Sequence, residues 1–133
     1  MDINGVKSVN SVNSLVLAYL GDSVYELLIR DYFIKQGLNK VNNLQNVVTK
    51  YVSAKAQSKY IAYLMNNNLL KDDEIDIVKK GRNAKVFSHP KNTDILTYKW
   101  ATALECLFGY LYIKNDTKRI NEIINIIIGE NLW

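Results

Sequence analysis

Residues 17–33 read LAYLGDSVYELLIRDYF, and this stretch decides the fold class. Its apolar residues recur at intervals of three and four, which is the spacing of one face of an α-helix. The pattern extends over about Ser14 to Lys35, and Gly37 supplies the stop signal. Gly21 inside the stretch predicts a kink or a junction between two helices.

The rest of the chain continues the helical spacing. Strand-like alternation is absent, and only one proline and six glycines interrupt the sequence, so we expect an all-α domain. Between about Asn43 and Asn66 the apolar residues shift from face to face, which predicts two helices, with Ser53 starting the second. Further helices are expected over about Asp72–Lys80, over about Thr93–Lys114, and from Asp116 or Thr117 to near Gly129.

Length and composition are those of one compact domain. With 133 residues and 48% hydrophobic content, we expect a single domain over 1–133 with its core at about 14–129. The lone cysteine, Cys106, excludes an intrachain disulfide and fits a reducing compartment. The sequence has no signal-peptide pattern and no apolar run that would span a membrane, so a cytoplasmic location is expected.

Positive charge is concentrated in one segment. The chain has a formal net charge of +4, which is compatible with an anionic partner without specifying one. Residues 79–91 contain no Asp or Glu but hold five basic side chains: Lys79, Lys80, Arg82, Lys85 and Lys91. We expect Gly81–Asn92 to form a loop in which Gly81 supplies the bend and His89 is solvated. The segment is either a phosphate-binding surface or an ordinary solvated charge run.

Two carboxylates stand among apolar and small residues. They are Asp22 in LAYLGDSVYELL and Glu105 in WATALECLFGYLY. Burying a charged carboxylate is unfavourable unless it is paired, hydrogen-bonded or bound to a metal. Asp22 could be a helix N-cap and Glu105 the partner of a basic residue. Alternatively, each could be bound to a metal, although spacing and composition do not indicate that the two residues meet.

Several motifs carry a family resemblance. Leu20-Gly21-Asp22-Ser23-Val24 resembles the ribonuclease III signature, and Thr102–Gly109 (TALECLFG) resembles the second acidic motif of that family. Three further motifs are similar to the short Mini-ribonuclease III branch, which lacks the double-stranded-RNA-binding domain: Val52–Gln57 (VSAKAQ), Gly81–Lys85 (GRNAK) and Pro90–Asp94 (PKNTD).

The resemblance implies a specific enzyme. It implies an all-α, ribonuclease III-type homodimer that cleaves double-stranded RNA with Mg²⁺, leaving 5′-phosphate and 3′-hydroxyl ends, in the maturation of 23S ribosomal RNA precursors. Asp22 and Glu105 are the implied catalytic and metal-binding residues. The positions of Leu15, Ala18 and Thr102 are acidic in full-length ribonuclease III, so three carboxylates of that site are missing here. The implied RNA-binding residues are Lys79, Lys80, Arg82, Asn83 and Lys85.

Other interpretations stay open at this point. The chain could be an inactive relative that binds RNA or the ribosome, or a helical protein-interaction domain without an RNA role. Glu26, one turn after Asp22, could support the metal waters or pair with Arg30. Apolar surface around Leu15–Leu28 and Leu104–Ile113 is where we expect the dimer to form.

Overall fold

The described residues form a bundle of α-helices. The computed structural model describes residues 12–85, 91 and 93–130, and no strand occurs in these ranges. The helices are α1 (Ser14–Lys35), α2 (Val41–Val52), α3 (Ala54–Asn66), α4 (Asp72–Asn83), α5 (Ile95–Ile113) and α6 (Thr117–Gly129). None of these helices is both long and apolar enough to cross a membrane.

Most of the predicted helix boundaries are confirmed. Helix α1 spans the expected residues, and Gly37 follows it with a φ of +102°. The predicted break between α2 and α3 lies at Ser53, whose hydroxyl accepts a hydrogen bond from the Ala56 amide at 3.2 Å. Asp116 caps α6 in the same way, because its Oδ1 accepts from the Arg119 amide at 3.2 Å.

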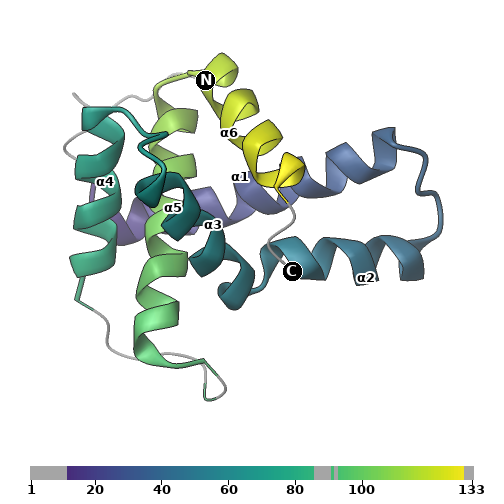
Figure 1. Cartoon of the computed structure of the whole chain (residues 1–133), viewed down its shortest axis with the longest axis horizontal. Helices are drawn as coiled ribbons and strands as arrows, with labels where there is room; N and C mark the ends of the chain where they lie inside the picture. Colours follow the sequence, from purple (N-terminus) through teal and green to yellow (C-terminus); the bar gives the residue numbers. More distant parts are fainter. Residues whose placement is uncertain (1–11, 86–90, 92, 131–133) are drawn as a thin grey trace.

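Helix α5 lies at the centre of the bundle. It packs against α1, α3, α4 and α6, and Figure 1 shows it crossing α1 near the middle of the molecule. Its residues Ala103, Leu104 and Cys106–Phe108 have no solvent exposure. The C-terminal half of α1 extends beyond this crossing and forms, together with α2, a projecting helical hairpin, which we call the arm (Figure 1). The expected central position of the 93–114 helix is therefore confirmed.

Two glycines allow α1 and α5 to touch backbone to backbone. A Cβ atom at Gly21 would overlap the Glu105 carbonyl oxygen, and one at Gly109 would overlap the Leu17 carbonyl oxygen. Any side chain at either position would force the helices apart. The expected kink at Gly21 is wrong, because α1 runs through this residue unbroken. The glycine provides close approach between helices instead of a bend.

Gly81 has the same role on the other side of α5. The expectation that Gly81 ends its helix and opens a loop is wrong, since α4 continues to Asn83. Gly81 is buried, and a Cβ there would lie 2.7 Å from the Cys106 Sγ and 3.2 Å from the Ala103 Cα. The gain from packing α4 closely against α5 outweighs the low helix propensity of glycine. Arg82 and Asn83, which were expected in the loop, are therefore helical residues.

A buried ion pair attaches α6 to α4. The Arg119 guanidinium donates to both carboxylate oxygens of Glu74 at 2.8 Å and to the Leu69 carbonyl oxygen at 2.6 Å. Glu74 also accepts from the Lys71 amide at 2.9 Å, which satisfies one backbone donor at the start of α4. Each buried charge in this group is therefore paired and hydrogen-bonded, as burial requires.

The close helix contact leads to a stability prediction. Gly109→Ala should lower the free energy of unfolding by about 3 kcal/mol or more, because overpacking against rigid backbone cannot be relieved by a rotamer change. Gly129→Ala is the matched control, since a Cβ there meets nothing within 4 Å. This control should be neutral or slightly stabilising. Urea unfolding of both variants measures the difference, and equal stabilities would contradict the proposed role of Gly109.

Candidate active site

The crossing of α1 and α5 carries a hollow of about 310 Å³. It is lined by two carboxylates together with apolar, hydroxyl and aromatic side chains: Leu15, Ala18, Tyr19, Asp22, Tyr98, Thr102 and Glu105. One wall of the hollow belongs to the N-terminal half of α1. The other wall belongs to the first half and the middle of α5. The two carboxylates singled out from the sequence are thus brought into one concave site by the glycine contact described above.

The carboxyl groups of Asp22 and Glu105 meet directly in this hollow. Burial and the nearby Asp22 carboxylate raise the pKa of Glu105 to about 8, and the protonated form of Glu105 hydrogen-bonds to Asp22. The two residues differ in exposure, since Asp22 is exposed whereas Glu105 is partly buried. The cost of burying a carboxylate, which drew attention to both residues in the sequence, therefore applies to Glu105 and not to Asp22. Two carboxyl groups that line one hollow form a site suited to a cation, because carboxylate oxygens are ligands that Mg²⁺ prefers.

Three predicted departures from full-length ribonuclease III lie in the wall of the same hollow. Leu15, Ala18 and Thr102, which the resemblance matches to acidic positions of full-length ribonuclease III, all line it. The Thr102 hydroxyl donates to the Tyr98 carbonyl oxygen at 2.9 Å. Within the described ranges, no group of three or more His, Cys, Asp or Glu side chains could hold a metal ion. Protein ligands from the described residues would therefore be Asp22 and Glu105.

Glu26 does not join this pair. Its Oε1 accepts from the Arg30 guanidinium at 2.8 Å, one turn further along α1. Both side chains are substantially exposed. The structure therefore favours the ordinary helical ion pair over a role for Glu26 beside the metal waters.

Gln57 is a site residue that was not predicted from the sequence. Its side chain is 3% exposed and hydrogen-bonds to the Glu105 carboxyl group from the first turns of α3. Its Nε2 also donates to the Val52 carbonyl oxygen at 2.9 Å. The sequence contained a signal for this residue. Gln57 ends the VSAKAQ motif, and a glutamine among buried residues of a helix needs polar partners.

The basic segment begins on α4 and continues beyond it. Lys79, Lys80 and Asn83 are exposed on the last turns of this helix, and Lys85 is exposed after it. Residues 86–90, with His89, and Asn92 lie outside the described residues, while Lys91 is exposed.

Arg82 is the member of this segment that contacts α5. Its guanidinium carbon lies 5.1 Å from the centre of the Trp100 ring, and its Nε donates to the Asn83 Oδ1 at 3.1 Å. Trp100 precedes Glu105 by five residues on α5. A cation held over an aromatic face is restricted in direction. Arg82 is thus oriented by the helix that carries the acidic site.

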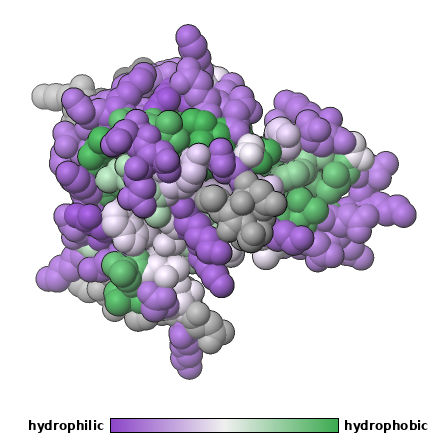
Figure 2. Space-filling model, in the orientation of Figure 1, coloured by the Kyte–Doolittle hydropathy of each residue, from purple (hydrophilic) through white to green (hydrophobic). Residues whose placement is uncertain are grey.

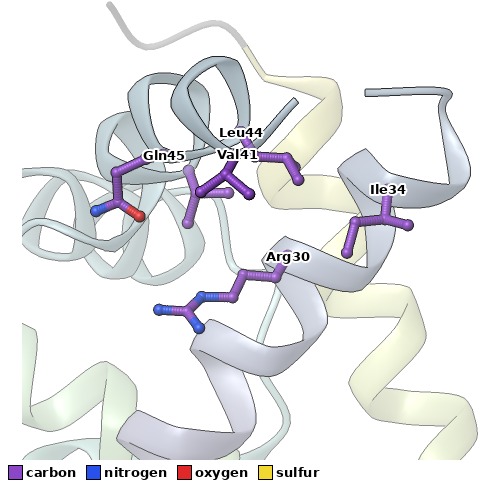
Figure 3. Close-up of a pocket in the computed structure, with 6 residues that line it drawn as sticks. Arg30, Ile34, Val41, Leu44 and Gln45 are labelled. Atoms are coloured by element: carbon purple, nitrogen blue, oxygen red, sulfur yellow. The ribbon is translucent and has the colours of Figure 1, made fainter. Parts of the chain in front are cut away.

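A second hollow, of about 150 Å³, lies in the arm. Figure 3 shows Arg30 and Ile34 from α1 facing Val41, Leu44 and Gln45 from α2. Figure 2 shows hydrophobic surface between the two helices of the arm. The lining of this hollow includes no carboxylate or other nucleophile. The hollow at the α1–α5 crossing is therefore the better candidate for an active site.

The raised pKa of Glu105 predicts a pH-dependent stability. In metal-free protein, folded Glu105 keeps its proton between about pH 5 and pH 8, whereas unfolded Glu105 loses it near its ordinary pKa of 4.5. Its contribution to the free energy of unfolding should therefore fall as pH rises, by at most about 1.4 kcal/mol per pH unit. Glu105→Gln should gain stability relative to the wild type from pH 5 to pH 8. Urea unfolding at both values checks this, and a constant difference would contradict it.

Comparison with known proteins places this site in a family. Residues 15–116 match the ribonuclease III domain. The Mini-ribonuclease 3 of Brevibacillus brevis is 45% identical over 92% of this chain and 92% of its own length. The Enterococcus faecalis Mini-ribonuclease 3 is 41% identical over 90% and 91%, respectively.

A solved structure is similar throughout. The crystal structure of a Fusobacterium nucleatum protein superposes with a TM-score of 0.83 at 34% identity, covering 94% of this chain and all of that one. The family match, the relatives and the fold agree, and the chain belongs to the ribonuclease III domain family as an endoribonuclease of the Mini-ribonuclease 3 group.

Proposed function

We propose that Asp22 and Glu105 are the catalytic residues and bind Mg²⁺ for the cleavage of double-stranded RNA. The observation that carries this proposal is the pair of carboxyl groups, Asp22 from α1 and Glu105 from α5, that line one hollow at the α1–α5 crossing. Burial raises the pKa of Glu105, and repulsion from Asp22 raises it further. Carboxylate oxygens are the ligands that Mg²⁺ prefers, and the cation would offset this repulsion. Ribonuclease III enzymes in general depend on a metal, which agrees with this chemistry.

Asp22 and Glu105 differ in their position at this site. Glu105 is held in place by partial burial on α5, whereas Asp22 is exposed on α1 and can meet a phosphate that approaches from solvent. When bound, Mg²⁺ supplies the positive charge that activates a water and stabilises the charge developing at the phosphate. Hydrolysis joins the water oxygen to phosphorus and breaks the bond to the 3′ oxygen, which takes a proton. The products are 5′-phosphate and 3′-hydroxyl ends.

The substrate that we propose is structured RNA, and in particular the paired ends of 23S ribosomal RNA precursors. The resemblance to the Mini branch supports this choice, and the basic segment supplies the charge for phosphates. Double-stranded RNA is recognised through its shape, its phosphates and its 2′-hydroxyls. Lys79, Lys80, Arg82, Asn83 and Lys85 are the residues we assign to RNA binding.

We further propose that the enzyme is a homodimer with one active site in each protomer. The exposed apolar side chains of α1 support a self-association surface: Leu15, Val16, Tyr19, Leu27 and Ile34 are 41–84% exposed. Large exposed apolar patches of this kind mark interaction sites. The segment Leu104–Ile113 is unsuited to this role, because Leu104 and Cys106–Leu111 are buried within the protomer.

The metal proposal predicts a separation of binding from cleavage. Asp22→Asn should reduce the rate of cleavage of duplex RNA in Mg²⁺ by at least about a thousandfold, because a neutral amide is a poor ligand for a hard cation. Binding of the same duplex in Ca²⁺ should stay within about twofold of the wild type. Single-turnover cleavage and filter binding measure the two effects. Wild-type cleavage by this variant would refute the site, and a wild type that binds but never cleaves would indicate an inactive relative.

The basic segment predicts a change in salt dependence. Replacing Arg82 and Lys85 together by Ala should raise the Michaelis constant and flatten the slope of log affinity against log salt by up to about two units, because each cation that no longer neutralises a phosphate lowers the slope by about one. The rate of the bound complex should change less. Replacing Lys35 and Lys118 by Ala removes the same charge outside the segment and is the control. Equal slopes in the two double variants would show that the duplex is held elsewhere.

The dimer predicts a point of disruption on α1. Leu27→Lys places like charges opposite each other near a symmetric contact and should give a monomeric mass by light scattering at micromolar concentration, where the wild type is dimeric. Leu96→Lys is the control, because Leu96 is 60% exposed but lies on α5, outside the α1 surface. A monomeric wild type with full activity would contradict the proposal.

A further inference from the structure

We infer that Gln57 is a positioning residue for the active site, which fixes the carboxylate of Glu105 in the direction of Asp22. The inference rests on the proposed function, since it gives Gln57 a purpose only if Glu105 binds the metal. It stands on three observations: the burial of Gln57, its two hydrogen-bonding directions and its one unsatisfied oxygen.

The amide of Gln57 is oriented by its surroundings. Its Nε2 donates to the carbonyl oxygen of Val52, the last residue of α2, at 2.9 Å. Turning the amide over would place Oε1 against that carbonyl oxygen, and two acceptors repel each other. The nitrogen must therefore face the end of α2. Its second hydrogen is then available to the Glu105 carboxyl group, to which the side chain is hydrogen-bonded.

This orientation leaves an acceptor without a partner. The Oε1 of Gln57 is fully buried and has no hydrogen-bond partner among the described residues. A buried unsatisfied oxygen destabilises the folded state, and such exceptions in a native structure call for an explanation. An apolar side chain of similar size would avoid this penalty. A glutamine at this position is explained if its amide nitrogen donates a hydrogen bond to the Glu105 carboxylate.

The arrangement controls where Glu105 points. Glu105 lies on α5, Gln57 on α3 and Asp22 on α1, so the carboxyl group of Glu105 is contacted from both neighbouring helices. A donor on the α3 side favours the charged carboxylate and occupies part of its hydrogen-bonding capacity. The remaining capacity faces Asp22 and the hollow. Partners of this kind around a metal ligand typically change metal affinity or activity by about 10- to 100-fold when they are removed.

The test compares metal affinity with folding. Gln57→Met removes the amide at similar length, and Gln57→Asn keeps an amide that is one carbon too short. Both should weaken Mg²⁺ binding about 10-fold or more in calorimetric titration without RNA, at a temperature where circular dichroism shows folded protein. Their cleavage rates at low Mg²⁺ should fall, with recovery at high Mg²⁺ and an unchanged Michaelis constant for duplex RNA. Tyr60→Phe, which removes a buried hydroxyl one turn further along α3, should retain wild-type Mg²⁺ affinity.

The possible outcomes are distinguishable. Wild-type Mg²⁺ affinity in both Gln57 variants would overturn the inference while leaving the assignment of Asp22 and Glu105 intact. Unfolding of both variants would also overturn it, because Gln57 would then be a purely structural residue. If Asp22→Asn binds Mg²⁺ as tightly as the wild type does, the proposed metal site itself fails.

Discussion

The backbone contact between α1 and α5 is the constraint on which the other features of this fold depend. Gly21 faces the Glu105 carbonyl group, and Gly109 faces that of Leu17, with no room for a Cβ at either position. This spacing brings the Asp22 and Glu105 carboxyl groups into hydrogen-bonding contact. With larger residues at the crossing, the helices would separate and the two carboxyl groups would move apart. The same packing that makes α5 central therefore also assembles the acidic pair.

The acidic pair is costly in the absence of a cation. Burial and the neighbouring Asp22 both disfavour ionisation of Glu105, which keeps its proton up to about pH 8. Part of the folding free energy is thus used to hold two carboxyl groups together, as is common at functional sites. Three other side chains that line the hollow, Leu15, Ala18 and Thr102, carry no charge, which limits this cost. Their lack of charge also leaves a sparser site, in which the direction of each carboxylate matters more.

The acidic pair and the basic segment lie on different helices. Two acidic side chains line the hollow at the α1–α5 crossing, whereas Lys79, Lys80 and Arg82 of the basic segment lie on the last turns of α4. The two regions are connected through α5, because Arg82 rests on Trp100, five residues before Glu105. Gly81 keeps α4 close against α5 and so sets the position of Arg82. An RNA held by the segment could therefore be oriented relative to the acidic pair by rigid helices.

The helical class, most of the helix boundaries and the two acidic residues of the site could all be predicted from the sequence. These features follow from local spacing, capping residues such as Ser53 and short motifs, all of which involve neighbours along the chain. The roles of Gly21 and Gly81 as close-packing residues, instead of a kink and a loop, became clear only in the folded molecule. The same is true of the contact between Gln57 and Glu105. A glycine or a glutamine has the same local sequence signal in either role, and the choice between roles is made by residues on other helices that lie far away in the chain.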